Sequence, residues 1–176
     1  MKETLSKNEI KMLMESIDNL EDKTLIILGI TCGIRRGDIV SIEITNIDWA
    51  NETLKFWEQK KRRYLTIPLE KSTITYLRMY VKTLPDNQRF LFLFSDKTAN
   101  RKLKYYVKKA GIKKHISFHS LRATFVKRSK EEGRDVKMVC QITGDSERTI
   151  LKYYSEWTDD ELKERVDKMP IYNETW

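Results

Sequence analysis

The sequence predicts a mainly α-helical domain with a small antiparallel β-hairpin, which is the α+β class. Through most of the chain, apolar residues recur at intervals of three and four, the period of an amphipathic helix. Residues 52–69 (ETLKFWEQKKRRYLTIPL) differ, because aromatic and β-branched residues there flank a basic turn and indicate two short strands. With 176 residues and no linker, the chain is expected to form one domain over 1–176, with its core at 5–155 and a tail helix within 156–176.

Two helices are expected before the hairpin. In the first, within 5–20, Ser6 and Glu9 form a capping box ahead of one apolar stripe. The second, at about 22–32, is rich enough in Leu and Ile to be buried on most sides, and it should end at a glycine. Residues 33–42 (GIRRGDIVSI) then indicate a turn that leads into a short helix.

Three further segments are expected after the hairpin. A helix is predicted at 70–83, and the apolar run RFLFLFS at 89–95 indicates a buried extended segment. A basic helix follows at about 98–110, and Gly111 should mark its C-terminus. Exposed basic helices are usually only solvated, but this one also suits a wall that faces DNA.

The last third of the chain indicates three helices and a tail. The first helix should run from His119 to Glu132 and stop at the next glycine. Asp135 and Ser146 are the expected N-caps of the other two. The tail TDDELKERVDKM has a capping box and one apolar face, so this short helix could fold back or dock on a neighbouring subunit.

The composition favours a polyanionic partner. Lys and Arg number 34 against 26 Asp and Glu, which gives a formal net charge of +8 and a pI of about 9.4. Nucleic acid is therefore the first expectation and an anionic membrane surface the second. The longest apolar run, Leu25–Ile30, is too short to span a bilayer, and no signal peptide precedes it, so a cytoplasmic protein without membrane association is expected.

The two cysteines give no sign of a metal site. Cys32 and Cys140 lie in apolar helical patterns without metal-ligand spacing, so buried reduced thiols are the simplest interpretation, with one disulfide as the alternative. We expect neither a metal nor another cofactor, and no small-molecule substrate.

Residues 117–155 (SFHSLRATFVKRSKEEGRDVKMVCQITGDSERTILKYYS) carry the candidate chemistry. His119 and Arg122 are three apart on a helix and so share one face. The arginine offers a fork of donors to an anion, and the histidine can move a proton near neutral pH. A tyrosine at the same place could attack a phosphorus and hold it covalently. Taken singly, such a pair is more often a satisfied surface pair, and a tyrosine pair more often packs in a core.

This stretch resembles the C-terminal half of the catalytic domain of tyrosine recombinases, the phage integrase family. The family pattern is H-x-L-R, then Gly-His, then a tyrosine nine residues after that histidine. Here Asp145 follows Gly144, and Tyr154 stands nine residues beyond Asp145. The resemblance extends over 30–155, because GIRRGDIV lies along the family's G-x-R, small residue, acid and aliphatic run. It implies the recombinase catalytic fold.

The resemblance also implies roles for particular residues. Arg35 and Arg122 would clamp the scissile phosphate, Tyr154 would be the nucleophile, and His119 is the candidate general base that takes its proton. The reaction would be metal-free DNA cleavage and rejoining through a 3′-phosphotyrosine intermediate. In the family a hairpin lysine protonates the leaving 5′-oxygen, and counting back from Pro-Leu favours Lys60.

Alternatives remain for two of these roles, and a buried acid is also implied. Lys61 competes with Lys60, and Tyr153 is the alternative nucleophile, although adjacent helix positions cannot both point into one site. Asp38 is expected to be a buried acid that supports Arg35.

Asp145 departs from the family pattern, which has a histidine or a tryptophan that donates a hydrogen bond to the phosphate. An ionised aspartate cannot donate, and it would repel the anion if it pointed inward. Either it turns away to hold an arginine or lysine, or another group such as Lys152 or His115 fills the gap. The high Lys and Glu content and this unusual site would suit an archaeal viral integrase.

The expected partner is double-stranded DNA, with a homo-tetramer on DNA for the full-length protein. The chain starts one helix before Arg35, so the N-terminal core-binding domain of such recombinases is expected to be absent from it. The candidate DNA contacts are basic side chains on the first turn, the hairpin and two helices: Arg36, Arg62, Arg63, Arg101, Lys102, Arg148 and Lys152.

Three other functions compete with the recombinase. Residues 135–154 have the helix, glycine turn and helix of a non-catalytic helix-turn-helix module, with Arg148 and Lys152 able to reach DNA. A type IB topoisomerase would share the chemistry but relax supercoils as a monomer. A helical interaction protein would show no salt-sensitive DNA binding. The helix-turn-helix alternative leaves the Arg35 turn, the lysine hairpin and the His119–Arg122 pair unexplained.

Overall fold

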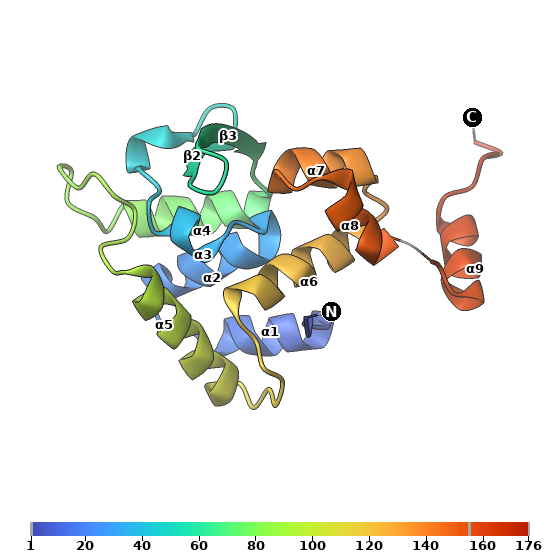
Figure 1. The fold of residues 1–176 in the computed structure, drawn as a ribbon, viewed down its shortest axis with the longest axis horizontal. Helices are drawn as coiled ribbons and strands as arrows, with labels where there is room; N and C mark the ends of the chain where they lie inside the picture. Colours follow the sequence, from blue (N-terminus) through green and yellow to red (C-terminus); the bar gives the residue numbers. More distant parts are fainter. Residues whose placement is uncertain (1, 155, 176) are drawn as a thin grey trace.

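The computed structural model describes residues 2–154 and 156–175 and is mostly helical, with one small sheet (Figure 1). The ends of the predicted core and tail, residues 155 and 176, lie outside the described residues. The elements in chain order are α1 (Lys7–Ser16), α2 (Leu20–Cys32), α3 (Arg36–Ile39), η1 (Ile44–Asn46), β1 (Ile47–Asp48), β2 (Thr53–Glu58), β3 (Arg63–Pro68), α4 (Lys71–Val81), α5 (Asp96–Lys109), α6 (Phe118–Glu131), α7 (Val136–Thr143), α8 (Glu147–Tyr154) and α9 (Asp159–Lys168). The predicted α+β class is confirmed.

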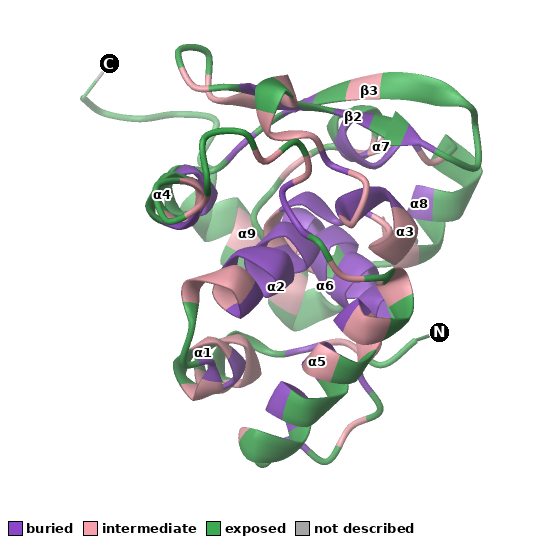
Figure 2. Ribbon diagram, turned by 90° about the vertical axis from the view of Figure 1, so that its left-hand side faces the viewer, coloured by how far each residue is buried: buried purple, intermediate pink, exposed green. Residues whose placement is uncertain are grey.

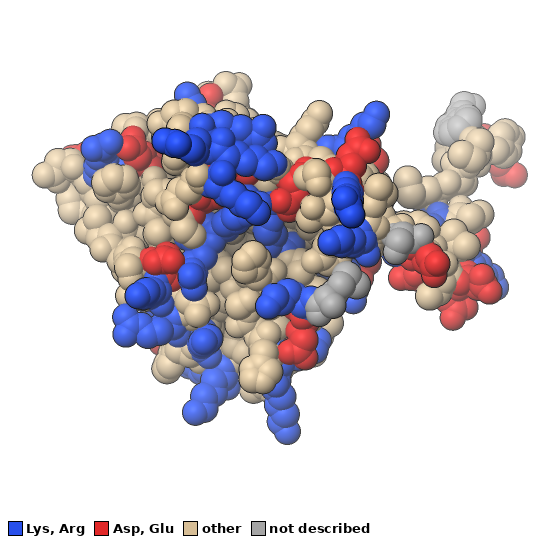
Figure 3. Space-filling model, in the orientation of Figure 1, with Lys and Arg blue, Asp and Glu red and all other residues tan. Residues whose placement is uncertain are grey.

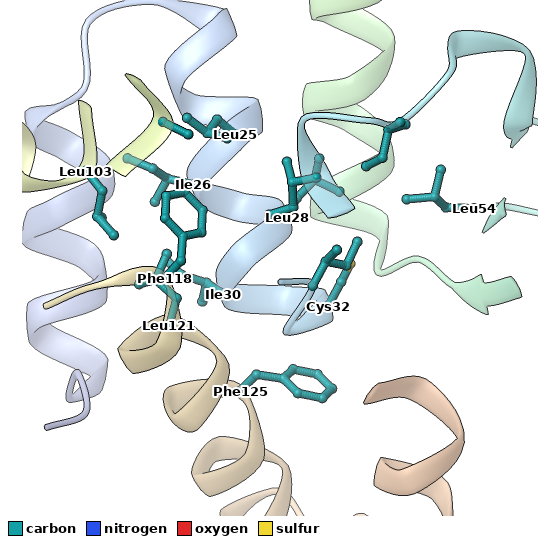
Figure 4. Packing of buried hydrophobic residues seen from close by; sticks show 14 of the residues in the cluster. Leu25, Ile26, Leu28, Ile30, Cys32, Leu54, Leu103, Phe118, Leu121 and Phe125 are labelled. Atoms are coloured by element: carbon teal, nitrogen blue, oxygen red, sulfur yellow. The ribbon is translucent and has the colours of Figure 1, made fainter. Parts of the chain in front are cut away.

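Helix α2 forms the centre of the core. Its Leu25–Ile30 stretch is buried all round because α2 packs against α4, α5 and α6, and Figure 2 shows it among them. In Figure 4, Ile26 of α2 lies beside Leu103 of α5 and Phe118 of α6. Burying one such aliphatic side chain is worth about 1.5–3 kcal/mol. Helix α2, which leads into the turn with Arg35, and helix α6, which carries His119 and Arg122, are thus fixed to each other by the core.

Close contact between α2 and α6 depends on Gly29. A Cβ atom at this position would lie 2.7 Å from Cδ1 of Leu121, closer than packed carbon atoms allow. Four residues later Gly33 ends α2 with a φ of 62°, a left-handed conformation that glycine adopts without strain. The chain therefore turns sharply over α6, and the turn delivers Arg35 to the N-cap position of α3.

The predicted hairpin is confirmed and belongs to a three-stranded antiparallel sheet in the order β1-β2-β3. The two-residue strand β1 was not predicted, because so short a strand carries no alternation. Along β2, Leu54, Phe56 and Glu58 face inward, while Lys55 and Trp57 face solvent. The sheet thus brings a basic tip, together with one buried acid, towards the turn after α2.

The segment 89–95 is only partly as predicted. Leu91 and Phe92 are buried, but Leu93 is 75% exposed. The segment forms no strand and is held by one bridge between Phe90 and Glu43. An apolar run of this length cannot show from sequence alone which of its members face inward.

The C-terminal helices follow the expected caps. Asp135 accepts a hydrogen bond from the Met138 amide at 2.8 Å, and Gly144 ends α7 with a φ of 74°. Helix α9 lies beyond α8, at the side of the molecule away from α5 (Figure 1). No helix within residues 2–154 and 156–175 is both long and apolar enough to cross a membrane.

Candidate active site

Arg122 is fixed between the ends of two helices. Its side chain is only 9% exposed, and its guanidinium donates to the carbonyl oxygens of Gly33 and Thr143, the latter at 2.8 Å. These carbonyls end α2 and α7, where the helix dipole favours a cation. Burial lowers the pKa of Arg122 and Asp145 opposes this shift, yet arginine remains charged at any physiological pH.

Asp145 joins Arg122 to Arg35. Its Oδ1 lies 2.8 Å from NH2 of Arg35, and its Oδ2 lies 2.7 Å from NH2 of Arg122. The Nε of Arg122 also donates to Oδ2, at 3.2 Å. Asp145 thus holds an arginine, as one of the sequence-based possibilities stated, but it does not turn away from the site, because its carboxylate lies between Arg35 and Arg122. Neither Lys152 nor His115 is among the described residues that line the pocket containing Arg35 and Arg122.

Glu58 is a second acid in this cluster, and sequence reasoning missed it. Its side chain is 1% exposed, with Oε1 3.1 Å from NH1 of Arg35 and Oε2 2.9 Å from Nε of Arg63. The signal was present, because alternation along β2 places Glu58 on the face of Leu54 and Phe56. A glutamate on a buried strand face requires a cationic partner. We call Arg35, Arg122, Asp145 and Glu58 the arginine cluster.

Asp38 is buried as the resemblance implied, but its hydrogen bond goes to the hairpin. Oδ1 accepts from the Gln59 amide at 3.2 Å. Burial raises the pKa of this carboxyl group, and the hydrogen bond to Gln59 and the charge of Arg35 oppose the rise. Asp38 therefore links the first helical turn after Arg35 to the end of β2.

His119 shares a pocket of about 230 Å³ with both arginines. The residue lies in the first turn of α6 and is exposed. Partial burial, followed by the positive charges of Lys2, Arg122, Arg35 and Arg36, lowers the pKa of the imidazole, so its neutral, proton-accepting form is favoured. We call this hollow the arginine pocket; it is lined by Arg35, Arg36, Gly37, Asp96, Asn100, Ser117, Phe118, His119 and Arg122.

The two candidate nucleophiles lie outside the arginine pocket. No tyrosine occurs among the described residues that line it. The Tyr154 hydroxyl donates to the carbonyl oxygen of Arg134 at 2.8 Å, and burial raises its pKa to about 12. Burial, and then the charge of Asp145, raise the pKa of Tyr153, while Arg122 lowers it. Charges of the arginine cluster therefore shift the pKa of Tyr153 but are not among the causes of the pKa shift of Tyr154.

The two candidate lysines differ in their placement. Lys61 reaches back from the hairpin tip and donates to the carbonyl oxygen of Gly144, beside Asp145. Lys60 is exposed at the tip. The structure thus places Lys61 against the turn that carries the arginine cluster.

A basic band covers one face of the molecule. Figure 3 shows Lys and Arg side chains gathered from the hairpin at the top, across the centre near α3, to α5 below. Most candidate DNA contacts are exposed or partly exposed: Arg36, Arg62, Arg63, Arg101, Arg148 and Lys152. Three of the candidates are paired with carboxylates of the protein itself: Arg36 with Asp96 at 3.2 Å, Arg63 with Glu58 at 2.9 Å, and Lys102 with Asp22 at 2.9 Å. Within the described ranges, His, Cys, Asp and Glu form no group of three that could hold a metal ion.

Comparisons with known proteins give a consistent result. A family model described as the phage integrase family matches residues 3–161. The chain is 26% identical over 179 residues to tyrosine recombinase XerA of Pyrococcus horikoshii, covering 96% of this chain and 61% of that protein. It is 28% identical over 176 residues to XerA of Pyrococcus furiosus, covering 94% and 61%. The chain thus spans about three fifths of the length of these relatives.

Solved structures show the same fold. The crystal structure of XerA recombinase superposes with a TM-score of 0.83 at 24% identity, covering 98% of this chain and 67% of that one. The catalytic domain of bacteriophage HP1 integrase gives a TM-score of 0.71 at 18% identity, covering 98% of both chains. The Tn1549 transposon integrase in complex with transposon right end DNA gives 0.78 at 15%, covering 96% and 66%.

Proposed function

The chain belongs to the phage integrase family, as the sequence resemblance predicted, and we propose from this that it is the catalytic part of a site-specific DNA recombinase. The observation that carries the proposal is the convergence of Arg35, Arg122 and His119 on one pocket. Two forks of donors and one proton acceptor suit a phosphodiester under attack. The basic band around the pocket supports double-stranded DNA as the substrate.

The proposed reaction needs no external energy source. A tyrosine hydroxyl attacks the phosphorus, a 3′-phosphotyrosine bond forms, and the bond to the 5′-oxygen breaks. His119 takes the tyrosine proton, and a hairpin lysine gives a proton to the departing oxygen. Attack by the 5′-hydroxyl of another strand reverses these steps and completes strand exchange. Arg35 and Arg122 stabilise the negative charge that develops on the non-bridging oxygens. Loss of one such donor typically lowers the reaction rate by about 10²–10³.

We propose that the nucleophile is one of the adjacent pair, Tyr154 or Tyr153. The spacing from Asp145 favours Tyr154, whose hydroxyl must first leave the Arg134 carbonyl. The charges of Asp145 and Arg122 act on Tyr153. For the lysine, the contact with Gly144 favours Lys61, while the count from Pro68 favours Lys60.

The test is covalent capture of DNA. Bound sequences are first selected from a random duplex pool, and a nicked suicide duplex is built on the selected site. The protein is incubated with it in EDTA, and adducts that survive SDS are counted for the wild type, Tyr153→Phe and Tyr154→Phe. We expect an adduct that one of the two substitutions abolishes and the other spares.

Each other result has a defined meaning. Salt-sensitive binding without an adduct on the selected site would contradict the recombinase and support the helix-turn-helix module. Relaxation of any supercoiled plasmid, without site preference, would support the topoisomerase. Strand exchange between two duplexes needs several subunits, so we propose a homo-tetramer on DNA for the full-length protein, acting inside the cell where its DNA lies.

A further inference from the structure

The chain itself occupies the arginine donors that the proposed reaction needs. Arg35 donates hydrogen bonds from NH1 to Glu58 at 3.1 Å and from NH2 to Asp145 at 2.8 Å. Arg122 directs Nε and NH2 at Asp145 and its other contacts at backbone carbonyls. In the free chain, therefore, both guanidinium groups donate to the Asp145 carboxylate, while each also lines the arginine pocket.

The position of Asp145 resembles that of a bound phosphodiester. A phosphodiester between two arginines would offer one non-bridging oxygen to each guanidinium. Asp145 does the same with its carboxylate, because Oδ1 meets Arg35 and Oδ2 meets Arg122. A negatively charged phosphate cannot approach both arginines closely while a second anion lies between them.

We propose that Asp145 is an intramolecular competitor of the scissile phosphate, which must displace this carboxylate from Arg35 and Arg122 before cleavage. The proposal deepens the proposed function, since it takes the ligand of the arginine pocket to be a phosphodiester. It assigns a role to the residue that departs most from the family pattern.

The surroundings of Asp145 allow this displacement. It follows Gly144, whose φ of 74° marks the turn between α7 and α8, and its side chain keeps 16% exposure. When the carboxylate leaves, Arg122 retains the carbonyls of Gly33 and Thr143, and Arg35 retains Glu58. Neither arginine is left without a partner.

Glu58 provides the contrast. It is also an acid on Arg35, but it is 1% exposed and anchored in strand β2 between Arg35 and Arg63. Gly144 packs so closely that a Cβ there would lie 2.4 Å from Oε1 of Glu58. Glu58 is thus the fixed acid that orients Arg35, and Asp145 is the acid that moves.

Displacement of Asp145 would also act on the nucleophile. Asp145 lies directly before α8, which carries both tyrosines, and neither tyrosine lines the arginine pocket in the described part of the free chain. Movement of this turn shifts the start of α8. Arrival of the phosphate is therefore linked to the placement of the attacking hydroxyl.

The experiment measures phosphate binding without any cleavage. Inorganic phosphate is titrated at constant ionic strength into the wild type and Asp145→Asn, and the Nε–H resonances of Arg35 and Arg122 are followed by NMR. We expect the substitution to lower the dissociation constant by about tenfold or more, because it removes a charge in contact with both arginines.

The matched control is Glu43→Gln. Glu43 is not among the residues that line the arginine pocket, and it pairs at 2.7 Å with Arg89, whose side chain is 72% exposed. We expect less than about a twofold change there, since exposed charges are well screened. A similar gain in both variants would mean general electrostatics and would overturn the proposal.

The opposite result is equally decisive. If Asp145 only positions the arginines, Asp145→Asn will bind phosphate no better than the wild type, or worse, and the proposal fails. Thermal unfolding checks that the variant folds, and Asp145→Ala replaces it in the titration if it does not. A tenfold gain in phosphate affinity without a covalent DNA adduct would support Asp145 as a competitor of phosphate and contradict the recombinase function. An adduct without a gain in phosphate affinity would support the recombinase function and contradict the role of Asp145.

Discussion

The arginine cluster and the tyrosine end of α8 differ in how far the free chain has assembled them. In the cluster every guanidinium is held at 2.7–3.2 Å by an acid. At the end of α8 the hydroxyl of Tyr154 is bound to the Arg134 carbonyl, and neither tyrosine of the described chain lines the arginine pocket. The arginines proposed to bind phosphate are already held together, by carboxylates, whereas the tyrosines proposed to attack it are not yet beside them.

The difference follows from what each region packs against. Arg122 lies on α6, and Arg35 follows α2, so both are fixed by the extensive contact between α2 and α6 in the core. Helix α8 spans only Glu147–Tyr154 and buries Ile150, with exposed charges over much of its surface. A short helix anchored in the core by one fully buried residue shifts at a lower free-energy cost than α2 or α6, which bury many.

The largest expected effect comes from changing Arg122 in the arginine cluster. Arg122→Lys keeps the charge but loses the fork that meets two oxygens at once. We expect the single-turnover rate of adduct formation to fall by about 10²–10³. Arg128→Lys is the control, because Arg128 lies on the same helix but pairs with Glu131 and Glu132 instead. A Lys variant with the full rate would show that the fork is not used.

Glu58→Ala tests whether the cluster is built on its fixed acid. Removing one partner of a buried ion pair is strongly destabilising, and we expect a loss of about 3 kcal/mol in the free energy of unfolding by urea. Arg63 adds little to this value because its side chain is 50% exposed. The control is Glu43→Ala, whose partner Arg89 is 72% exposed, and which should cost about 1 kcal/mol or less. Equal losses in the free energy of unfolding would show that Glu58 contributes no more to stability than an exposed ion pair does.

A smaller effect is expected from Gly144→Ala, at the turn that joins the two regions. The left-handed backbone costs a non-glycine residue about 1–2 kcal/mol, and contact of the new Cβ with Glu58 adds to it. Gly111→Ala is a close control, since its φ is 75° and nothing lies within 4 Å of its Cβ. Comparing the free energy of unfolding of the two variants separates the cost of the left-handed backbone, which both share, from the cost of contact with Glu58, which only Gly144→Ala has. We expect Gly144→Ala to lose about 1 kcal/mol more than the control, and equal losses would contradict the close packing on Glu58.

The sequence predicted the fold better than the site because local patterns determine helices and strands. Periodicity and caps located the main helices, and alternation located the hairpin. His119 and Arg122 of the motif line the same pocket, and their roles stay predictions. The contacts of Arg35 with Glu58 and Asp145 span 23 and 110 residues, and no local pattern reports such pairs.

The choice between neighbours depends on details that spacing does not determine. Adjacent residues on a helix point about 100° apart, so choosing between Tyr153 and Tyr154 requires the rotation of α8 about its axis. Choosing between Lys60 and Lys61 requires the shape of the hairpin tip, where Arg62 has a φ of 52°. One residue of slippage in either place exchanges the candidates.

The smallest expected effect is at the hairpin tip, where charge remains exposed. Because carboxylates neutralise Arg35 and Arg122 in the free chain, the first attraction of DNA must come from exposed cations such as Arg62. Arg62→Ala should weaken binding to a labelled duplex severalfold and reduce the slope of log affinity against log salt by about 1. Fluorescence anisotropy at several salt concentrations measures both.

Lys11→Ala provides the comparison for this prediction, since α1 lies at the opposite end of the molecule from the hairpin (Figure 1). For Lys11→Ala, the slope of log affinity against log salt should equal that of the wild type. If both variants lose slope equally, attraction is spread over the whole basic surface. If neither does, the attraction comes from other exposed cations such as Arg101 and Arg148, and Arg62 is not among the first contacts with DNA.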